Sequence, residues 1–275
     1  MWPTPPTFVR HDTGRPVVPE PARSTGSEIL LVRLLMVLLC LFWPGATFAF
    51  GAIAADVTVS QDGASASLTI TSPLFTTSAT NEQLLAFIST DYLSGTNTTV
   101  KSVTGAGLAW TLIKRTNVQS GSAEIWGAFA AAPVNAVSVS ATLSQSVVAS
   151  ITVMSFAGVN PGGAIGATNS KSAATGAPTA SLVTTGNNSW VLGVGNDFSN
   201  AIARAVGTGQ VLIHQDLTST GDTYWVQRAT SAIPASGTTV TINDTAPTKD
   251  KYNLSIVELL AAVSGTTYRF LDRNS

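Results

Sequence analysis

The sequence predicts an all-β fold, a two-sheet β-sandwich built from two related halves. Strand-like runs follow one another in the middle of the chain, separated by clusters of Gly, Ser, Asn and Pro, at residues 84–90, 108–116, 123–130, 136–143 and 148–156. Short runs broken by turn residues at such intervals are typical of sandwiches and barrels. A weaker copy of the pattern follows in the second part of the chain, which indicates the two halves.

Composition narrows the class of protein further. Charged residues make up only 11% of the 275 residues, while hydrophobic residues reach 44% and the net charge is -1. These values argue against a disordered chain and, without a basic cluster, against a nucleic-acid binder. The single cysteine, Cys40, lies near the N-terminus, so we expect no disulfide or thiolate metal site in the domain that follows.

Residues 1–54 are expected to be an N-terminal leader. An apolar run follows Arg33, Pro44-Gly45 end it, and small residues come next, which is the order of parts in a secretory signal peptide. The alternative is an uncleaved anchor, because residues 34–55 carry no charge and about 20 apolar residues span a bilayer. Both alternatives predict a protein that is secreted or held at the cell surface.

The first elements after the leader are expected to form a hairpin. Residues 57–60 and 67–71 alternate apolar and polar side chains around Asp62-Gly63, as two paired strands with a short turn would. Residues 136–143, rich in Val and Ser, are expected to form an exposed edge strand.

A second hairpin is predicted between residues 110 and 130. Its turn is Gln-Ser-Gly-Ser at residues 119–122, and pairing of Thr116 with Glu124 would place Lys114 opposite Trp126. The indole rings of Trp110 and Trp126 are expected to lie in the core.

The internal repeat sets the expected domain organisation. Residues 81–87 match 187–193, and residues 121–126 match 221–225. Each half alone would expose a large apolar face, so the halves are expected to share one core as facing or interleaved sheets. We therefore predict one domain, residues 55–262, with halves 56–159 and 178–262, a crossover loop at 160–177 and a tail at 263–275.

Three short segments of the first half resemble a known group of domains. They are Gly-Ala-Gly-Leu-Ala-Trp at residues 105–110, Glu-Ile-Trp at 124–126 and Ser-Phe-Ala-Gly-Val at 155–159. This part of the chain resembles the jelly-roll-like β-sandwich domains of secreted, mostly uncharacterised bacterial surface proteins. The resemblance is good for residues 84–159 and weak for the second half. It implies an extracellular accessory or adhesive module and brings no catalytic residues.

Few residues could carry catalysis or bind a metal. After the leader there is one histidine, His214, whereas a catalytic triad also needs a positioned Ser and acid, and zinc needs three or four ligands. We expect His214 on a strand surface. No metal or other cofactor is expected, although a structural calcium stays open because calcium takes carboxylate, amide and carbonyl oxygens.

Carboxylates are the remaining candidates for chemistry, because a glycosidase needs two carboxyl groups about 5–10 Å apart. The candidates are Asp91, Glu124, Asp197, Asp216 and Asp222. A cross-strand ion pair with Lys114 explains Glu124 better.

Asp91-Tyr92 and Asp197-Phe198 are the predicted ligand-binding residues. Each pair follows a predicted strand, at matching places in the two halves. In a purely structural role, the aspartate would bond its own turn backbone and the aromatic ring would cover the core edge. In a binding role, each pair would hold a sugar ring, since binding residues concentrate on loops of a rigid scaffold.

These observations predict an exported, non-enzymatic surface module with a structural or adhesive role. The alternative is a carbohydrate-binding, lectin-like module, and a glycoside-active enzyme or an accessory domain of one comes third. The expected partners are glycans or copies of the protein itself, paired through exposed edges such as residues 136–143. No nucleic acid is expected as a partner, and membrane contact is expected only through an uncleaved N-terminal segment.

Overall fold

The computed structural model describes residues 52–263, which belong to one compact unit of the chain, Phe48–Ser275. Residues 1–51 of the predicted leader lie outside the described residues, as does nearly all of the predicted C-terminal tail. The last leader residues belong to the folded domain instead, because Ile53 is buried and β1 begins at Ala54.

Residues 52–263 form sixteen strands and no helix, which confirms the all-β class. The first half contains β1 (Ala54–Asp62), β2 (Ser67–Thr71), β3 (Glu82–Thr90), β4 (Val100–Gly105), β5 (Thr111–Thr116), β6 (Ser122–Ala130), β7 (Val139–Val147) and β8 (Ala149–Ala157). The second half contains β9 (Ile165–Ala173), β10 (Thr179–Val183), β11 (Trp190–Asp197), β12 (Ala205–Val206), β13 (Gln210–Leu217), β14 (Thr223–Ala229), β15 (Thr239–Ala246) and β16 (Tyr252–Leu259).

These strands form four antiparallel sheets, not the two that were predicted. In the first half, a five-stranded sheet β1-β8-β3-β6-β5 accompanies a three-stranded sheet β2-β7-β4. In the second half the orders are β9-β16-β11-β14-β13 and β10-β15-β12, so both halves have the same strand order. The two-sheet prediction was wrong because each half has enough strands to close its own sandwich.

Matching bulges repeat the local backbone geometry in both halves. The pairing of β5 with β6 shifts between Leu112 and Lys114, and the pairing of β13 with β14 shifts between Leu212 and His214. A bulge places an extra residue opposite one partner residue and turns the strand. The repeat read from the sequence is therefore a repeat of structure as well.

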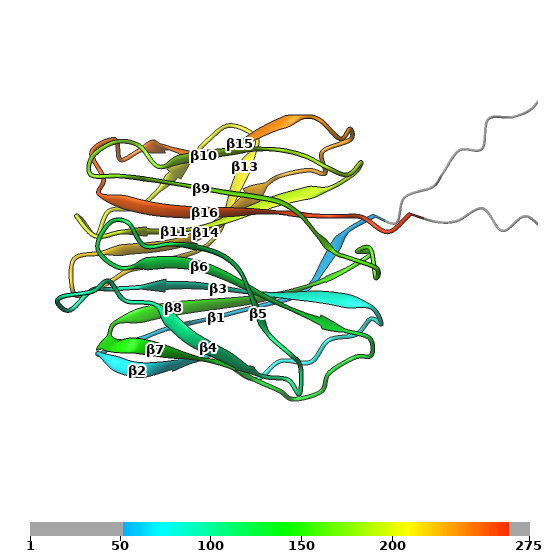
Figure 1. Ribbon diagram of the computed structural model, residues 1–275, viewed down its shortest axis with the longest axis horizontal. Coiled ribbons are helices and arrows are strands. Elements are labelled where there is room, and N and C mark those ends of the chain that lie inside the picture. Colours follow the sequence, from blue (N-terminus) through cyan, green and yellow to red (C-terminus); the bar gives the residue numbers. More distant parts are fainter. Residues whose placement is uncertain (1–51, 264–275) are drawn as a thin grey trace, which may run out of the picture. The chain divides into compact units, whose positions relative to one another are not determined.

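The two five-stranded sheets pack face to face, and we call this interface the junction. Its core combines residues of the first half (Leu85, Phe87, Ile125, Met154, Phe156) with residues of the second (Leu192, Val194, Val226, Val257, Leu259). In Figure 1, β3 and β6 lie beside β11, β14 and β16, with β2 and β7 on the far side of the first half and β10 and β15 on the far side of the second. A separate apolar core fills each sandwich.

The junction explains why the central strands are apolar on both faces. Every residue of β3 and β16 is buried, as expected for strands covered on two sides. The predicted shared core is therefore present as facing sheets, but it adds to the core of each half instead of replacing it.

The predicted first hairpin and the predicted exposed edge strand were both wrong. β1 pairs with β8 and β2 pairs with β7, in different sheets, so residues 57–60 and 67–71 form no hairpin. The turn at Asp62-Gly63 leads the chain from one sheet towards the other. β7 is the central strand of its sheet and not an exposed edge, because β2 and β4 pair on either side of it, and Val139 is fully buried.

The predicted crossover loop at 160–177 contains a strand. β9 (Ile165–Ala173) is the edge strand beside β16 and opens the second half. Its sequence, Ile-Gly-Ala-Thr-Asn-Ser-Lys-Ser-Ala, has little apolar alternation, because an edge strand with partly exposed faces needs few apolar side chains.

The tryptophans of the first half lie close to their predicted places. Trp126 is buried in the core of the first sandwich, and Trp110 is half-buried against the same core. The indole nitrogen of Trp110 donates to the carbonyl of Gly105 at 3.1 Å.

Candidate functional site

The loops after β3 and β11 bring the two predicted aromatic residues together. The rings of Tyr92 and Phe198 meet edge to face, with centroids 6.1 Å apart and planes at 72°. The ends of these strands are held together by hydrogen bonds across the junction, from Asn196 Nδ2 to the Thr90 carbonyl at 3.0 Å and from Ser89 Oγ to the Gly195 carbonyl at 2.9 Å. We call Tyr92 and Phe198 the aromatic corner.

The two aspartates, in contrast, do not occupy equivalent places. The amide of Asp91 donates to the carbonyl of Val148, and the amide of Phe198 donates to the carbonyl of Lys251. Asp91 is therefore the counterpart of Phe198, and Asp197, the last residue of β11, is the counterpart of Thr90. The sequence match was one residue out of register, which in a strand moves a side chain to the opposite face.

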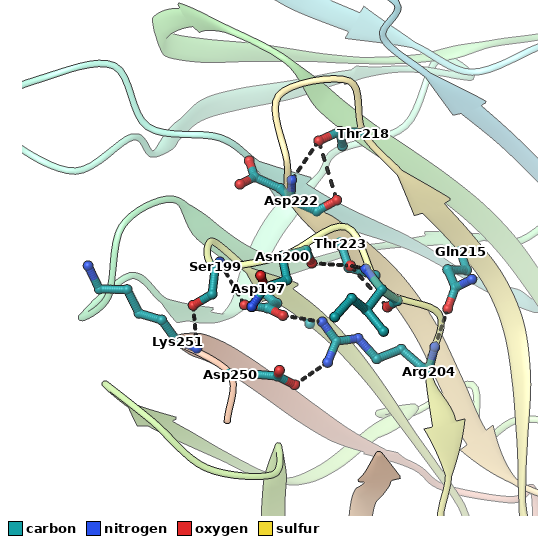
Figure 2. Close-up of polar contacts among 12 residues, drawn as sticks. Asp197, Ser199, Asn200, Arg204, Gln215, Thr218, Asp222, Thr223, Asp250 and Lys251 are labelled. Atoms are coloured by element: carbon teal, nitrogen blue, oxygen red, sulfur yellow. Dashed lines mark hydrogen bonds and ion pairs between the residues drawn. The ribbon is translucent and has the colours of Figure 1, made fainter. Parts of the chain in front are cut away.

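Asp197 is engaged inside the second sandwich. Its carboxylate accepts from Arg204 Nη2 at 2.6 Å and from the Ser199 amide at 2.8 Å. The guanidinium of Arg204 also donates to Asp250 through Nη1 (Figure 2). The same guanidinium lies over the ring of Trp225, 4.3 Å from its centroid. Because the side chains of Asp197 and Arg204 are both fully buried, Asp197 is not free to contact a ligand.

Asp91 instead lies near a carboxyl group of the other half. Burial and the negative charge of Asp91 raise the pKa of Asp222, which precedes β14. Asp222 Oδ2 lies 3.1 Å from the hydroxyl of Tyr224, which lies 3.3 Å from the carbonyl of Val148. Nothing local in the sequence indicates this pairing, because the two aspartates come from different halves.

A histidine and an aspartate also meet across the junction. His214, on the edge strand β13, lies with its Nε2 2.9 Å from Oδ1 of Asp62 at the end of β1. His214 is thus a strand residue, as predicted, but its half-buried ring faces the other half. Burial opposes ionisation of Asp62, but hydrogen bonds from His214 and Ser150 and the charge of His214 outweigh it and lower the pKa of Asp62.

A cavity of about 280 Å³ lies beside this pair, between the turn after β1 and the turn after β13. Its lining residues are Asp62, Gly63, Ala64, Asp216, Leu217, Thr218 and Ser219. Burial and the charge of Asp62 raise the pKa of Asp216. Carboxyl groups of both halves, Asp62 and Asp216, therefore line this cavity at one edge of the junction. Of the two, only Asp216 is a candidate on the basis of the sequence.

Glu124 has a structural role. It is fully buried, and its carboxylate accepts from Arg115 at 2.7 and 3.0 Å, from the Val100 amide at 2.8 Å and from the Trp126 indole at 3.0 Å. The predicted cross-strand ion pair is present, but its partner is Arg115 and not Lys114, because the bulge between Leu112 and Lys114 shifts the register.

The described residues contain neither a candidate metal site nor a candidate membrane-spanning helix. Within residues 52–263, no three His, Cys, Asp or Glu side chains are grouped so that they could hold a metal ion. The same residues include no helix long and apolar enough to cross a membrane.

Comparison with known proteins provides no relative from which the fold or the site could be interpreted. No protein-family model, curated protein or solved structure matches the chain. The structure defines an all-β protein of two sandwiches with the same strand order, whose loops bring an aromatic corner and several carboxyl groups together where the halves meet.

Proposed function

We propose that this chain is an exported, non-enzymatic adhesion or structural module that contacts its partner through the aromatic corner. The observation that carries the proposal is the pairing of Tyr92 with Phe198, one from each half. Both rings are half-buried, and the same loops expose Leu93 (66%) and Ile202 (48%). Apolar side chains gathered on rigidly held loops are typical of an interaction site.

The roles of the candidate carboxylates support a module without catalysis. Glu124 and Asp197 are buried in ion pairs with arginine, so these two candidates for glycoside chemistry have structural roles. Export is supported by the leader predicted from the sequence, and with it a place outside the cell or at its surface.

The strand orders support a jelly-roll-like classification for each half. Each half has eight strands in two sheets, β1-β8-β3-β6-β5 and β2-β7-β4 in the first half and the same order in the second. Eight strands in two sheets is the arrangement of jelly rolls.

Carbohydrate recognition is the second candidate, and Asp91 favours it. Its half-exposed carboxylate accepts a hydrogen bond from the backbone amide of Tyr92 at 2.5 Å. A polar group on the same loop as an aromatic ring is a common arrangement in small-molecule sites. Self-association through residues 136–143 loses support, because β7 has partners on both sides.

The test combines a glycan array and light scattering on the full chain with the double variant Tyr92→Ala/Phe198→Ala. We expect binding to a glycan or to another copy of the chain, and loss of that binding in the double variant with little change in melting temperature. Phe129→Ala, at an exposed aromatic residue on β6 (36%), is the matched control and should bind normally. A wild-type chain that stays monomeric and binds no glycan would remove both candidates.

A further inference from the structure

The cavity between the two halves has the features of a small binding pocket. It opens between the ends of β1 and β13, the edge strands of the two five-stranded sheets. Its volume, about 280 Å³, is just below the range of about 300–1,000 Å³ for pockets that hold drug-sized ligands. It would therefore accommodate one sugar ring or one long side chain.

The carboxyl groups around the cavity favour a positively charged ligand. Asp62 and Asp216 both line it, and the ionisable group that acts on both of them is His214. His214 Nε2 is already 2.9 Å from Asp62 Oδ1. Within residues 52–263, no donor contributes a hydrogen bond to the carboxylate of Asp216, whose surroundings act on it through burial and charge.

A half-buried carboxylate that lacks a donor gains most from a cation that supplies several. Burial makes its ionised form costly, and hydrogen bonds between charged groups are stronger than neutral ones. A primary ammonium group brings three donors and one positive charge. The exposed hydroxyl of Ser219 lines the same cavity and adds a polar contact for the rest of the ligand.

We propose that this cavity binds a primary ammonium group, with Asp216 as its ion-pair partner and Asp62 completing the negative surface. An amino sugar and a lysine side chain both carry this group and both match the size of the cavity. Because Asp62 belongs to the first half and Asp216 to the second, the site exists only where the halves are joined. It uses neither residue of the aromatic corner and does not depend on the proposed adhesive function.

The experiment is a titration of the isotope-labelled full chain followed by amide NMR spectra. The ligands are glucosamine, N-acetylglucosamine, which has the same ring without the charge, and N-acetyl-lysine methylamide, which carries the ammonium group on a side chain. We expect glucosamine, the lysine derivative or both to shift the amide signals of Gly63, Ala64, Thr218 and Ser219, and N-acetylglucosamine to leave them in place. Binding of glucosamine alone would identify a sugar ligand, and binding of the lysine derivative alone would identify a polypeptide ligand.

A pair of charge-matched variants tests the assignment to Asp216. Asp216→Asn should weaken binding about tenfold, the loss expected for one charged hydrogen-bonded contact. Asp56→Asn removes the same charge from an exposed position elsewhere on β1 and should leave binding unchanged. The proposal is overturned if neither ammonium ligand shifts these signals, or if the acetylated sugar shifts them equally. Both comparisons use the wild-type chain and do not depend on how the variants fold.

Discussion

Asp197 and Arg204 form an ion pair, 2.6 Å between Oδ2 and Nη2, in which both side chains are fully buried. This contact shows that one of the predicted ligand-binding residues is part of the interior of the second sandwich. It also makes the pair sensitive to mutation, because a buried charge that loses its partner is costly.

Removing one member of this pair should strongly destabilise the protein. Asp197→Ala is expected to lower the free energy of unfolding by about 3–5 kcal/mol, the usual cost of breaking a buried ion pair. Chemical denaturation followed by circular dichroism measures the loss. Asp91→Ala, at the half-exposed aspartate that the sequence repeat predicts to be equivalent, should cost less than about 1 kcal/mol. An equal loss in the two variants would contradict the assigned roles.

Stability should fall as the pH rises through neutrality. Burial raises the pKa of Asp244 to about 7, whereas an aspartate in the unfolded chain titrates near about 3.9. The folded state therefore holds a proton that the unfolded state has lost, so the stabilisation present below pH ~4 is lost progressively up to about pH 7, by at most about 1.4 kcal/mol per pH unit. Burial raises the pKa of Asp222 as well, which adds to the same trend.

The matched variant for this prediction is Asp244→Asn, which keeps the shape of the side chain and cannot ionise. Denaturation curves between about pH 5 and pH 8 should be flatter for the variant than for the wild type. Both carboxylate oxygens of Asp244 are buried without a hydrogen-bond partner in the described part of the chain, so the variant should also be the more stable protein at pH 8. A pH profile unchanged by the substitution would show that Asp244 titrates normally.

Trp126 should be a stability residue. Its side chain packs in the core of the first sandwich with 8% exposure and donates to Glu124 at 3.0 Å. Trp126→Ala is expected to cost about 3–5 kcal/mol, and Trp110→Ala, at a half-buried position, should cost less. If Trp126→Ala melted like the wild type but lost a binding activity, Trp126 would belong to a site.

The separated first half, residues 52–159, should not behave as a stable monomer. It keeps its own sandwich core, but the face that contains Leu85, Phe87 and Ile125 would lose its cover from the second half. Exposed apolar area costs about 25 cal/mol per Å², so we expect association or loss of a sharp thermal transition, measured by light scattering and calorimetry. A monomeric fragment with a cooperative transition would mean that the junction contributes little to stability.

Local pattern was enough to locate most strands but not their partners. The runs at residues 84–90, 123–130 and 148–156 correspond closely to β3, β6 and β8, because alternation and turn residues act over a few positions. The partners of β1 and β2 lie far along the chain, and the choice between a hairpin and a crossing between sheets depends on how the whole sandwich closes.

In the candidate site, too, some residues can be predicted from the sequence and others cannot. Tyr92 and Phe198 could be chosen from the sequence because each follows a strand in the repeat, and the structure brings them into contact. The pairing of Asp62 with His214 could not be foreseen, since residues of different halves meet only after both sheets have formed and packed.

By itself the sequence determined the all-β class, the two related halves and the loops on which the aromatic corner stands, because these follow from side-chain periodicity and from the repeat. The tertiary structure alone decided that there are four sheets, that Asp197 is buried against Arg204 and that carboxyl groups of both halves line one cavity. The physical reason is that burial and charge pairing depend on what packs against each face, and a register difference of one residue changes which face a side chain occupies.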